Sequence, residues 1–395
     1  MTRPAAVLVA LDKFKGSIDA AAACRAVADG ITAAGQLAVP CPVADGGDGT
    51  LDALASAGFD RVRVPGHGPL GDLTTAEFVR RDEVAVVELA SVCGLAALPG
   101  GRLEPWASGT LGVGTVALAA VEAGARHVVI ALGGSASTDG GVGLLIGLGA
   151  RVLDNASTPC TPDARGLLAA HTLDLSTLDP RLRQVRFSVA TDVTSPLTGP
   201  TGAAHLFGPQ KGVTAADVDI LDRALHAWAA LLHDVTGVDA TSVSGAGAAG
   251  GTAAALITAL GADVISGADF VMDAIGLDTK LNEAGLVVTG EGSWDDQSEA
   301  GKAPMGVISR ATRAGVPVVL VAGRVTATAT RLAQLGVHRH YQLLDLQPDP
   351  AEAMRSAAAL LHRTGTLLAK DERADTAGRI EPQVAHSGSL QQKET

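Results

Sequence analysis

The sequence is poor in aromatic residues and in charge. Among its 395 residues, aromatics make up 3% and charged residues 18%, whereas hydrophobic residues make up 47%. The core must therefore be built from Val, Leu, Ile and Ala, which is typical of α/β proteins with buried sheets. The length is roughly twice that of a common domain and predicts two domains, or one domain with a large insertion.

Cysteines and basic residues are also few. The four cysteines, Cys24, Cys41, Cys93 and Cys160, form no CxxC pair. This spacing argues against a disulfide framework and a structural zinc site, and it fits a reducing cytosol. The formal net charge is −12. We therefore expect no nucleic-acid partner, because phosphate backbones bind surfaces with a surplus of Lys and Arg.

Long hydrophobic runs are missing as well. The N-terminal apolar run ends at Asp12 and Lys13, which is too early for a signal peptide. The longest uncharged stretch, residues 240–262, is rich in Gly and Ala and would make a poor membrane span. These features predict a cytoplasmic protein without a membrane partner.

What the chain does have is an alternation of short apolar runs with longer segments rich in Ala and Leu. Runs such as AAVLVALD and HVVIALGG predict strands, and segments such as DVDILDRALHAWAALLHDV predict helices. The alternation indicates parallel sheets covered by helices. Residues 371–395 are polar and lack periodicity, so we expect a disordered tail there.

Six predicted strands lead into polar or glycine-rich loops. The six segments are ALDKFKGS, VADGGDGT, ALGGSASTDGG, ATDVTSP, TGEGSWDD and AGRVT. In open α/β sheets, ligands bind outside the carboxyl ends of the strands. We therefore expect the loops to line a cleft with converging Asp, Lys, Ser and Gly residues.

The segment ALGGSASTDGGVG, residues 131–143, contains five glycines. Glycines let backbone N–H groups turn toward an anion, and a helix N-terminus and hydroxyl groups add further attraction. The pattern predicts a phosphate or ATP site made by Gly133, Gly134, Ser135, Gly140 and Gly141, although a tight strand-to-helix turn is the alternative. Asp139 in this loop indicates either a bound cation or a helix N-cap.

Two N-terminal loops carry further candidates. VADGGDGT places Asp45 and Asp48 among glycines, where a carboxylate can hold Mg²⁺ or accept a proton, or can belong to a simple Asp-Gly turn. LDKFKGS gathers Lys13, Lys15 and Ser17, which form either an anion site or a solvated loop.

Later loops add fewer candidates. Asp192 ends a predicted strand, Lys211 lies between glycines in FGPQKG, and Asp295 and Lys302 follow the strand that ends in TGEG. The segment GAGAAG, residues 245–250, matches the dinucleotide fingerprint GxGxxG. The residues before it are a weak strand, so helix packing is the simpler interpretation.

Taken together, these motifs resemble those of the bacterial type-1 glycerate kinases, from about Leu8 to about Leu368. The matching stretches occur in the family's order and spacing: LDKFKGS, PVADGGDGT, ALGGSASTDGG, ATDVTSPLTGPTGAAHLFGPQKG, SGAGAAGG, and VVTGEG followed by DDQSEAGKAP. The resemblance implies ATP-dependent phosphorylation of D-glycerate to 2-phosphoglycerate. It also implies a flavodoxin-like (Rossmann-like) parallel-sheet domain from residues 1–65 and 285–370, with a second mixed α/β domain, residues 66–284, inserted.

The resemblance also suggests roles for the candidates. Asp45 and Asp192 would face the γ-phosphate, one holding Mg²⁺ and the other orienting or deprotonating the acceptor hydroxyl. Lys15, the third catalytic candidate, would bind anionic oxygen with help from Ser17. The candidate substrate ligands are Lys13, Ser17, Lys211 and Lys302, and the candidate metal ligands are Asp45, Asp139, Asp192 and Asp295.

Two other functions stay open at this stage. An NAD-dependent dehydrogenase of a small hydroxy acid would rest on GAGAAG alone. A regulator that binds a nucleotide or a sugar acid without catalysis is the third interpretation. The sequence also leaves a homo-oligomer open.

Overall fold

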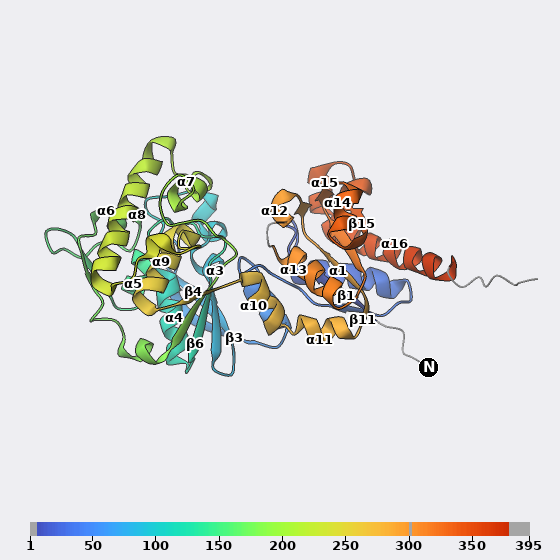
Figure 1. Cartoon of the computed structure of the whole chain (residues 1–395), viewed down its shortest axis with the longest axis horizontal. Coiled ribbons are helices and arrows are strands. Elements are labelled where there is room, and N and C mark those ends of the chain that lie inside the picture. The colour runs from blue at the N-terminus through green and yellow to red at the C-terminus, as the bar shows by residue number, and fades with distance from the viewer. Residues whose placement is uncertain (1–5, 300–301, 379–395) are drawn as a thin grey trace, which may run out of the picture.

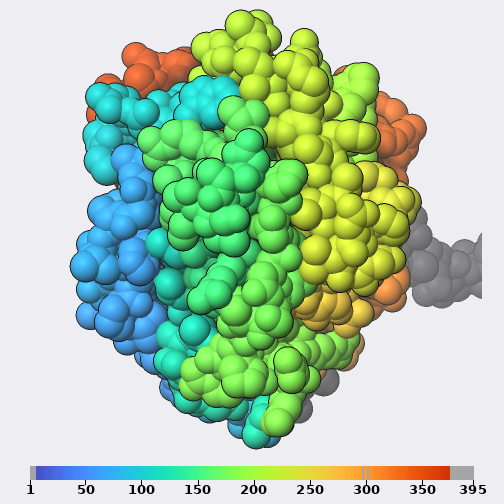
Figure 2. Space-filling view, turned by 90° about the vertical axis from the view of Figure 1, so that its left-hand side faces the viewer, coloured from blue at the N-terminus to red at the C-terminus, as the bar shows by residue number. Residues whose placement is uncertain are grey.

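The structure is a computed structural model that describes residues 6–299 and 302–378. It has two lobes (Figure 1). The blue N-terminal segments and the orange-to-red C-terminal segments form one lobe, and the middle of the chain forms the other. Figure 2 shows the outer surface of this second lobe, where green and yellow segments predominate.

The first lobe is built on a five-stranded parallel sheet. Its strands, from one edge to the other, are β15 (Val337–Gln342), β13 (Val318–Ala322), β11 (Ala284–Gly290), β1 (Ala6–Leu11) and β2 (Ala38–Pro40). Numbered along the chain within the lobe, this order is 2-1-3-4-5, which is the flavodoxin-like order. The sheet therefore confirms the predicted α/β fold made from both chain ends.

Both faces of this sheet are covered, as its apolar strands require. Val7 and Val9 point to a cluster shared with α1 (Ala20–Ala33) and α16 (Ala357–Gly378). Leu8, on the opposite face, joins a second cluster. That cluster includes side chains of α2 (Thr50–Ser56), α10 (Gly267–Ala274), α11 (Leu277–Asn282) and α13 (Ala303–Arg313).

Helix α16 runs further than the sequence predicts. It continues to Gly378, so residues 371–378 are helical, in contrast to the disordered tail expected from Asp371 onward. Asp371 lies beside β15, where its Oδ2 accepts a hydrogen bond from the Tyr341 hydroxyl (2.7 Å). Residues 379–395 lie outside the described residues.

The second lobe contains a six-stranded mixed sheet. Its order is β10 (Asp263–Ile265), β9 (Arg186–Ala190), β6 (His127–Ala131), β5 (Val84–Glu88), β4 (Leu73–Arg81) and β3 (Asp60–His67). Strands β3, β4 and β5 pair antiparallel, and the others pair parallel. The boundary expected at residue 65 thus falls inside β3, which already belongs to this sheet.

Helices cover the outer face of the second sheet. The helices of this lobe are α3 (Leu89–Cys93), α4 (Leu111–Glu122), α5 (Val142–Gly147), α6 (Ala164–Ala169), α7 (Ala203–Phe207), α8 (Ala215–Thr236) and α9 (Ala248–Leu260). A small antiparallel pair, β7 (Arg151–Leu153) and β8 (Thr172–Asp174), lies beside them. The remaining short elements belong to the first lobe: β12 (Ser293–Trp294), β14 (Arg324–Val325), α12 (Asp296–Glu299), α14 (Ala329–Gln334) and α15 (Pro350–Arg355).

The two lobes share a hydrophobic layer. Val86 and Val129 of the second sheet belong to the same buried cluster as Leu8 of the first, with Leu54 of α2 and Val271 of α10 in it as well. This packing fixes the loops of the two sheets relative to each other. Within the described ranges, no helix is long and apolar enough to cross a membrane.

Candidate active site

The loops that follow strands of both sheets meet through glycines. The Gly133 N–H, at the end of β6, donates to the carbonyl of Gly46 in the loop after β2 (3.1 Å). A Cβ on Gly133 would lie 2.4 Å from the Cα of Gly47. On its other side, Gly46 packs against Gly267 and the carbonyl of Ala190, where a Cβ would lie 2.9 and 3.2 Å away. A side chain at these positions would prevent the approach, so the glycines bring together the ends of four strands, β2, β6, β9 and β10.

Asp45 lies at this junction. Its Oδ1 accepts a hydrogen bond from the Gly47 N–H (3.1 Å). Its charge also influences the pKa values of Asp12, Lys13 and Asp192, so these groups share one electrostatic environment. Asp45 and Asp192 thus lie on either side of Gly267, and the charge of Asp45 acts on Lys13.

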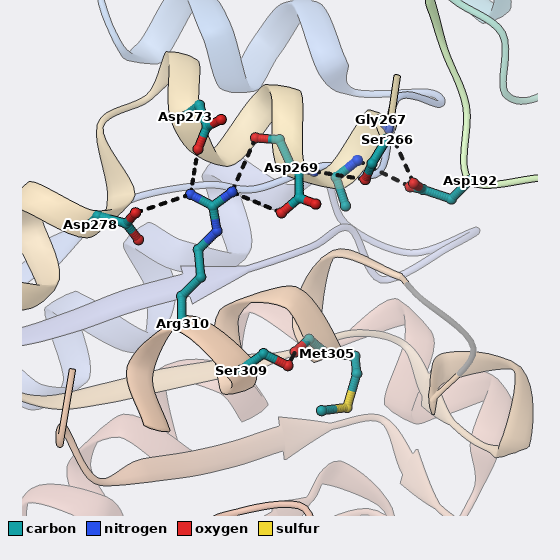
Figure 3. Close-up of polar contacts among 10 residues, drawn as sticks. Asp192, Ser266, Gly267, Asp269, Asp273, Asp278, Met305, Ser309 and Arg310 are labelled. Carbon is teal, nitrogen blue, oxygen red and sulfur yellow. Dashed lines mark hydrogen bonds and ion pairs between the residues drawn. The ribbon is translucent and has the colours of Figure 1, made fainter. Parts of the chain in front are cut away.

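Asp192 follows β9, and its carboxylate caps the N-terminus of helix α10 (Figure 3). Its two carboxylate oxygens accept hydrogen bonds from the N–H groups of Gly267 (3.1 Å) and Ala268 (3.0 Å), at the start of α10. Burial raises the pKa of Asp192, while its hydrogen bond with Ser266 opposes the shift. The Asp192 carboxylate therefore holds the start of α10 in place, although Asp192 and Gly267 are 75 positions apart in the sequence.

Figure 3 also shows what lies beyond Asp192 along α10. The buried guanidinium of Arg310, on α13, pairs with Asp269 (2.8 Å), Asp273 (2.5 Å) and Asp278 (3.4 Å). A cavity of about 410 Å³ between α10 and α13 is lined by Asp192 and Arg310 among others. The ion pairs of Arg310 thus connect α10 to α13 of the first lobe, and the hydrogen bonds to Asp192 connect α10 to the second lobe.

Asp12 and Lys13 lie at the point where the order of the first sheet reverses. They follow β1, whose neighbours are β2 on one side and β11 on the other, and ligands of open α/β sheets bind at such switch points. Burial raises the pKa of Asp12 to about 7, although the charge of Lys13 opposes the shift. The Lys13 Nζ lies 3.8 Å from Asp12 Oδ1. Across the switch point, Glu291 pairs with Lys302 (3.0 Å).

A cavity of about 250 Å³ opens beside Lys13, with Lys15, Ser17 and Asp48 also in its lining. Lys15 is exposed. The Ser17 hydroxyl donates to the carbonyl of Met354 (2.6 Å), which ties the loop to α15. The lysines and Asp48 predicted from separate loops therefore line one opening.

Asp139 takes a different position from the other carboxylates. It is fully buried, and its oxygens accept hydrogen bonds from Thr110 N–H (2.9 Å), Thr110 Oγ1 (2.7 Å), Gly141 N–H (3.2 Å) and Gly143 N–H (3.1 Å). Three of the four donors converge on Oδ2, so these contacts match the capping alternative. We therefore assign Asp139 to holding the glycine loop.

Lys211 reaches the same loop from the segment after α7. It is buried, and its Nζ donates to Ser135 Oγ (2.7 Å) and to the carbonyl of Ser137 (2.6 Å). Burial lowers the pKa of Lys211 to about 7. The structure thus unites Lys211 with Ser135, two candidates 76 positions apart.

The candidate metal ligands form no ready-made cage. Asp295 exchanges hydrogen bonds with Ser298, whose hydroxyl bonds to the Asp295 N–H (3.1 Å) and whose N–H bonds to its Oδ1 (3.2 Å). Across residues 6–299 and 302–378, no three His, Cys, Asp or Glu side chains are grouped to hold a metal ion.

Comparisons with known proteins bear on the family and the enzyme class. The model of the glycerate kinase family matches residues 7–371. The chain belongs to the glycerate kinase family. The glycerate kinase of Bacillus subtilis (strain 168) is 37% identical to it, over 92% of this chain and 96% of that protein. The glycerate 2-kinase of Escherichia coli (strain K12) is also 37% identical, over 89% and 93% of the two chains.

A solved structure extends the likeness to the fold. The crystal structure of a candidate glycerate kinase 2 from Salmonella typhimurium LT2 superposes with a TM-score of 0.79 at 34% identity, covering 94% of this chain and all of that one. Membership of the glycerate kinase family confirms the predicted enzyme class, a kinase acting on glycerate, and implies ATP as the phosphoryl donor.

The GAGAAG segment does not have the setting of a dinucleotide site in this glycerate kinase family member. It begins α9 and follows the short 3-10 turn Ala240–Ser242 rather than a strand. A Cβ on Gly250 would lie 2.3 Å from the carbonyl oxygen of Ser137, so this glycine serves a close approach of two loops. The dehydrogenase alternative therefore loses the one feature on which it rested.

Glu88 is a candidate that sequence reasoning missed. It ends β5, is buried, and accepts a hydrogen bond at Oε2 from the Leu51 N–H of α2 (2.9 Å). Burial raises its pKa to about 7, and its charge acts on Lys13. The sequence does contain a signal for Glu88, because it is a carboxylate at the end of the apolar strand EVAVVELA. The same signal identifies Asp192.

Proposed function

We propose that this chain transfers the γ-phosphoryl group of ATP to the 2-hydroxyl of D-glycerate, giving 2-phosphoglycerate and ADP. The observation that supports the proposal is the glycine junction: Gly267 packs against the Asp45 carbonyl, and its N–H donates to the Asp192 carboxylate (3.1 Å). The 2-position is favoured because the Escherichia coli relative is a glycerate 2-kinase.

Asp45 and Asp192 are the proposed catalytic carboxylates. Phosphoryl transfer needs positioning and charge neutralisation more than covalent help from the protein. The hydroxyl proton of glycerate passes to one of these carboxylates as the hydroxyl oxygen attacks the γ-phosphorus, and ADP leaves with the bridging oxygen. The hydrogen bonds that Asp192 accepts from α10 hold its oxygens in fixed directions.

The donor set also suits Mg²⁺, which prefers carboxylate oxygens and phosphate oxygens of the substrate. Asp45 would hold the Mg²⁺ ion together with Asp192 or Asp48. When bound, the ion neutralises charge on the phosphates. Because the described residues offer no three-ligand cluster, the ion would arrive largely coordinated by ATP.

Lysines supply the positive charge. Lys13 and Lys15 line the 250 Å³ cavity at the switch point and would bind anionic oxygens of the phosphates. Ser17, which donates a hydrogen bond to the Met354 carbonyl, would hold the loop that carries Lys13 and Lys15. Lys302 would balance the negative charge of Glu291, with which it forms an ion pair.

The test is a steady-state assay with ATP, Mg²⁺ and D-glycerate. We expect ADP only when glycerate is present, and ³¹P NMR should show the phosphate on carbon 2. A product phosphorylated at carbon 3 would overturn the proposed position, and binding without ADP release would favour a regulator. Light scattering on the same preparation would measure whether the enzyme is a homo-oligomer.

A further inference from the structure

Three buried hydroxyl groups near the glycine loop have no hydrogen-bond partner in the described chain. They belong to Ser137, Thr138 and Ser195, whose residues are 0%, 1% and 8% exposed. Buried hydroxyls are normally bonded, and leaving one without a partner costs about 1–3 kcal/mol. Three such groups in one region indicate a ligand that supplies the missing acceptors.

The three hydroxyl-bearing residues pack around the start of α9. A Cβ on Gly250 would lie 2.3 Å from the Ser137 carbonyl oxygen and 2.6 Å from the Thr138 Cα. The Ser195 carbonyl accepts a hydrogen bond from the Gly247 N–H (3.1 Å). Segments after β6 and β9 are therefore held against the same glycine-rich start of α9, where Ala249, Gly250 and Gly251 have left-handed backbone angles.

Lys211 adds a full positive charge to this region. Its Nζ bonds to Ser135 Oγ and to the Ser137 carbonyl, and neither partner is an anion. A lysine has three N–H donors, so one is left for a further acceptor. A buried cation without a bonded anion is costly, and burial accordingly lowers the pKa of Lys211 to about 7.

The charged groups around Lys211 do not neutralise it directly. Asp139 acts on it through space, but its oxygens are bonded to Thr110, Gly141 and Gly143. On the neighbouring segments, His205 of α7 faces Asp219 and Asp222, and Glu104 pairs with Arg102. Helix α9 itself contains no charged residue.

We propose that Lys211 and the hydroxyls of Ser137, Thr138 and Ser195 bind the carboxylate of the glycerate substrate. This inference rests on the proposed function and identifies the part of the substrate that this region recognises. A single buried lysine matches the single charge of a carboxylate, whereas a triphosphate would bury several unpaired charges. The open cavity with Lys13 and Lys15 is also lined by Asp19, Asp48 and Asp52, so it suits a polyphosphate that carries Mg²⁺ better than a bare carboxylate.

Ser195→Ala is the first test, because it removes one hydroxyl and little volume. We expect the Kd and KM for D-glycerate to rise about tenfold to a hundredfold, as for a lost hydrogen bond to a charged group, with the KM for ATP unchanged. The matched control is Thr258→Val in α9, whose buried hydroxyl already donates to the Ala254 carbonyl (2.8 Å). This control should keep the KM for glycerate.

Lys211→Met adds a readout besides activity. When a carboxylate binds beside Lys211, the amine should gain a proton at pH 8, so calorimetry in two buffers of different ionisation enthalpy should detect proton uptake in the wild type. Lys211→Met should lose both this uptake and glycerate binding. Lys280→Met, which alters a lysine beside Cys41, is the control. If Lys211→Met does not fold, Ser195→Ala decides.

The outcomes separate the two levels of the proposal. A wild type that turns over glycerate while Ser195→Ala keeps a normal glycerate KM would overturn the carboxylate site alone. A rise in the KM for ATP without a change for glycerate would show that the anion is a phosphate. A wild type that neither binds nor phosphorylates glycerate would overturn the proposed function, and this inference with it.

Discussion

Replacing Gly133 by Ala tests whether the contact between the two loops positions the catalytic groups. In the folded protein the new Cβ would lie 2.4 Å from the Gly47 Cα and 3.2 Å from its nitrogen. The first distance is about 1 Å shorter than the 3.4 Å at which ordinary contact begins. Both neighbours are backbone, so the loop after β2 or the end of β6 must move.

The expected loss follows from that displacement. Asp45 is bonded to the Gly47 N–H, so it moves with Gly47. A misplacement of about 1 Å at a catalytic group costs about a hundredfold in rate. We therefore expect kcat/KM of Gly133→Ala to fall by about two orders of magnitude. Overpacking should lower the free energy of unfolding by about 1–3 kcal/mol.

Two measurements separate these effects: glycerate-dependent ADP release and the melting temperature. Gly261→Ala is the control, since Gly261 has a φ of +64° and nothing within 4 Å of its Cβ position. It should lose about 1 kcal/mol of stability through backbone strain and keep a normal kcat/KM. A folded Gly133→Ala variant with wild-type kcat/KM would refute the proposed positioning role.

Three further predictions address single groups. Asp192→Asn should lower kcat at least about a hundredfold, because it removes the proposed catalytic carboxylate. It should also lower the melting temperature, because the amide keeps only one of the two hydrogen bonds to α10. A lower melting temperature with a normal kcat would leave only the capping role. Burial raises the pKa of Glu88 from 4.5 to about 7, so the folded protein holds a proton there that the unfolded chain has lost. The free energy of unfolding should therefore fall as the pH rises from 4.5 to 7, by at most about 3 kcal/mol. Equal losses of stability in the wild type and in Glu88→Gln across this range would contradict the expectation. EDTA should abolish ADP release without changing the melting temperature of the ATP-free enzyme, because no described residues form a resident metal cluster; a lower melting temperature would indicate a protein-held ion.

Much of the fold is predictable because its strands are buried on both faces. Runs such as VPVVLVAGR and HVVIALGG contain almost only apolar residues, and they form β13 and β6. Strand β4 is missed because its sequence, LTTAEFVRR, mixes polar and apolar residues, and its first residues are exposed. It becomes a strand through antiparallel pairing with β3 and β5, which short-range patterns do not reveal.

Charged residues are harder to interpret from the sequence, because their partners lie far along the chain. Asp139 beside glycines and hydroxyls is typical of a cation site near phosphate. Its bonds to Thr110, 29 positions earlier, give it a different task. Lys211 has the same difficulty, since its partner Ser135 is 76 positions away. Asp192 was found because it ends a strand, and the direction in which its oxygens bond depends on α10.

The two glycine-rich motifs show what such a pattern does and does not establish. In ALGGSASTDGGVG, Gly133 allows the backbone of Gly47 to approach, and in GAGAAG, Gly250 allows the carbonyl of Ser137 to approach. The second motif resembles a dinucleotide fingerprint because both need glycine where two backbones, or a backbone and a phosphate, come close. A glycine thus marks close approach, while the identity of the approaching group depends on the fold. Here the approach at Gly250 places Ser137 and Thr138 beside α9, where their hydroxyls lack partners and where we propose that the substrate carboxylate binds.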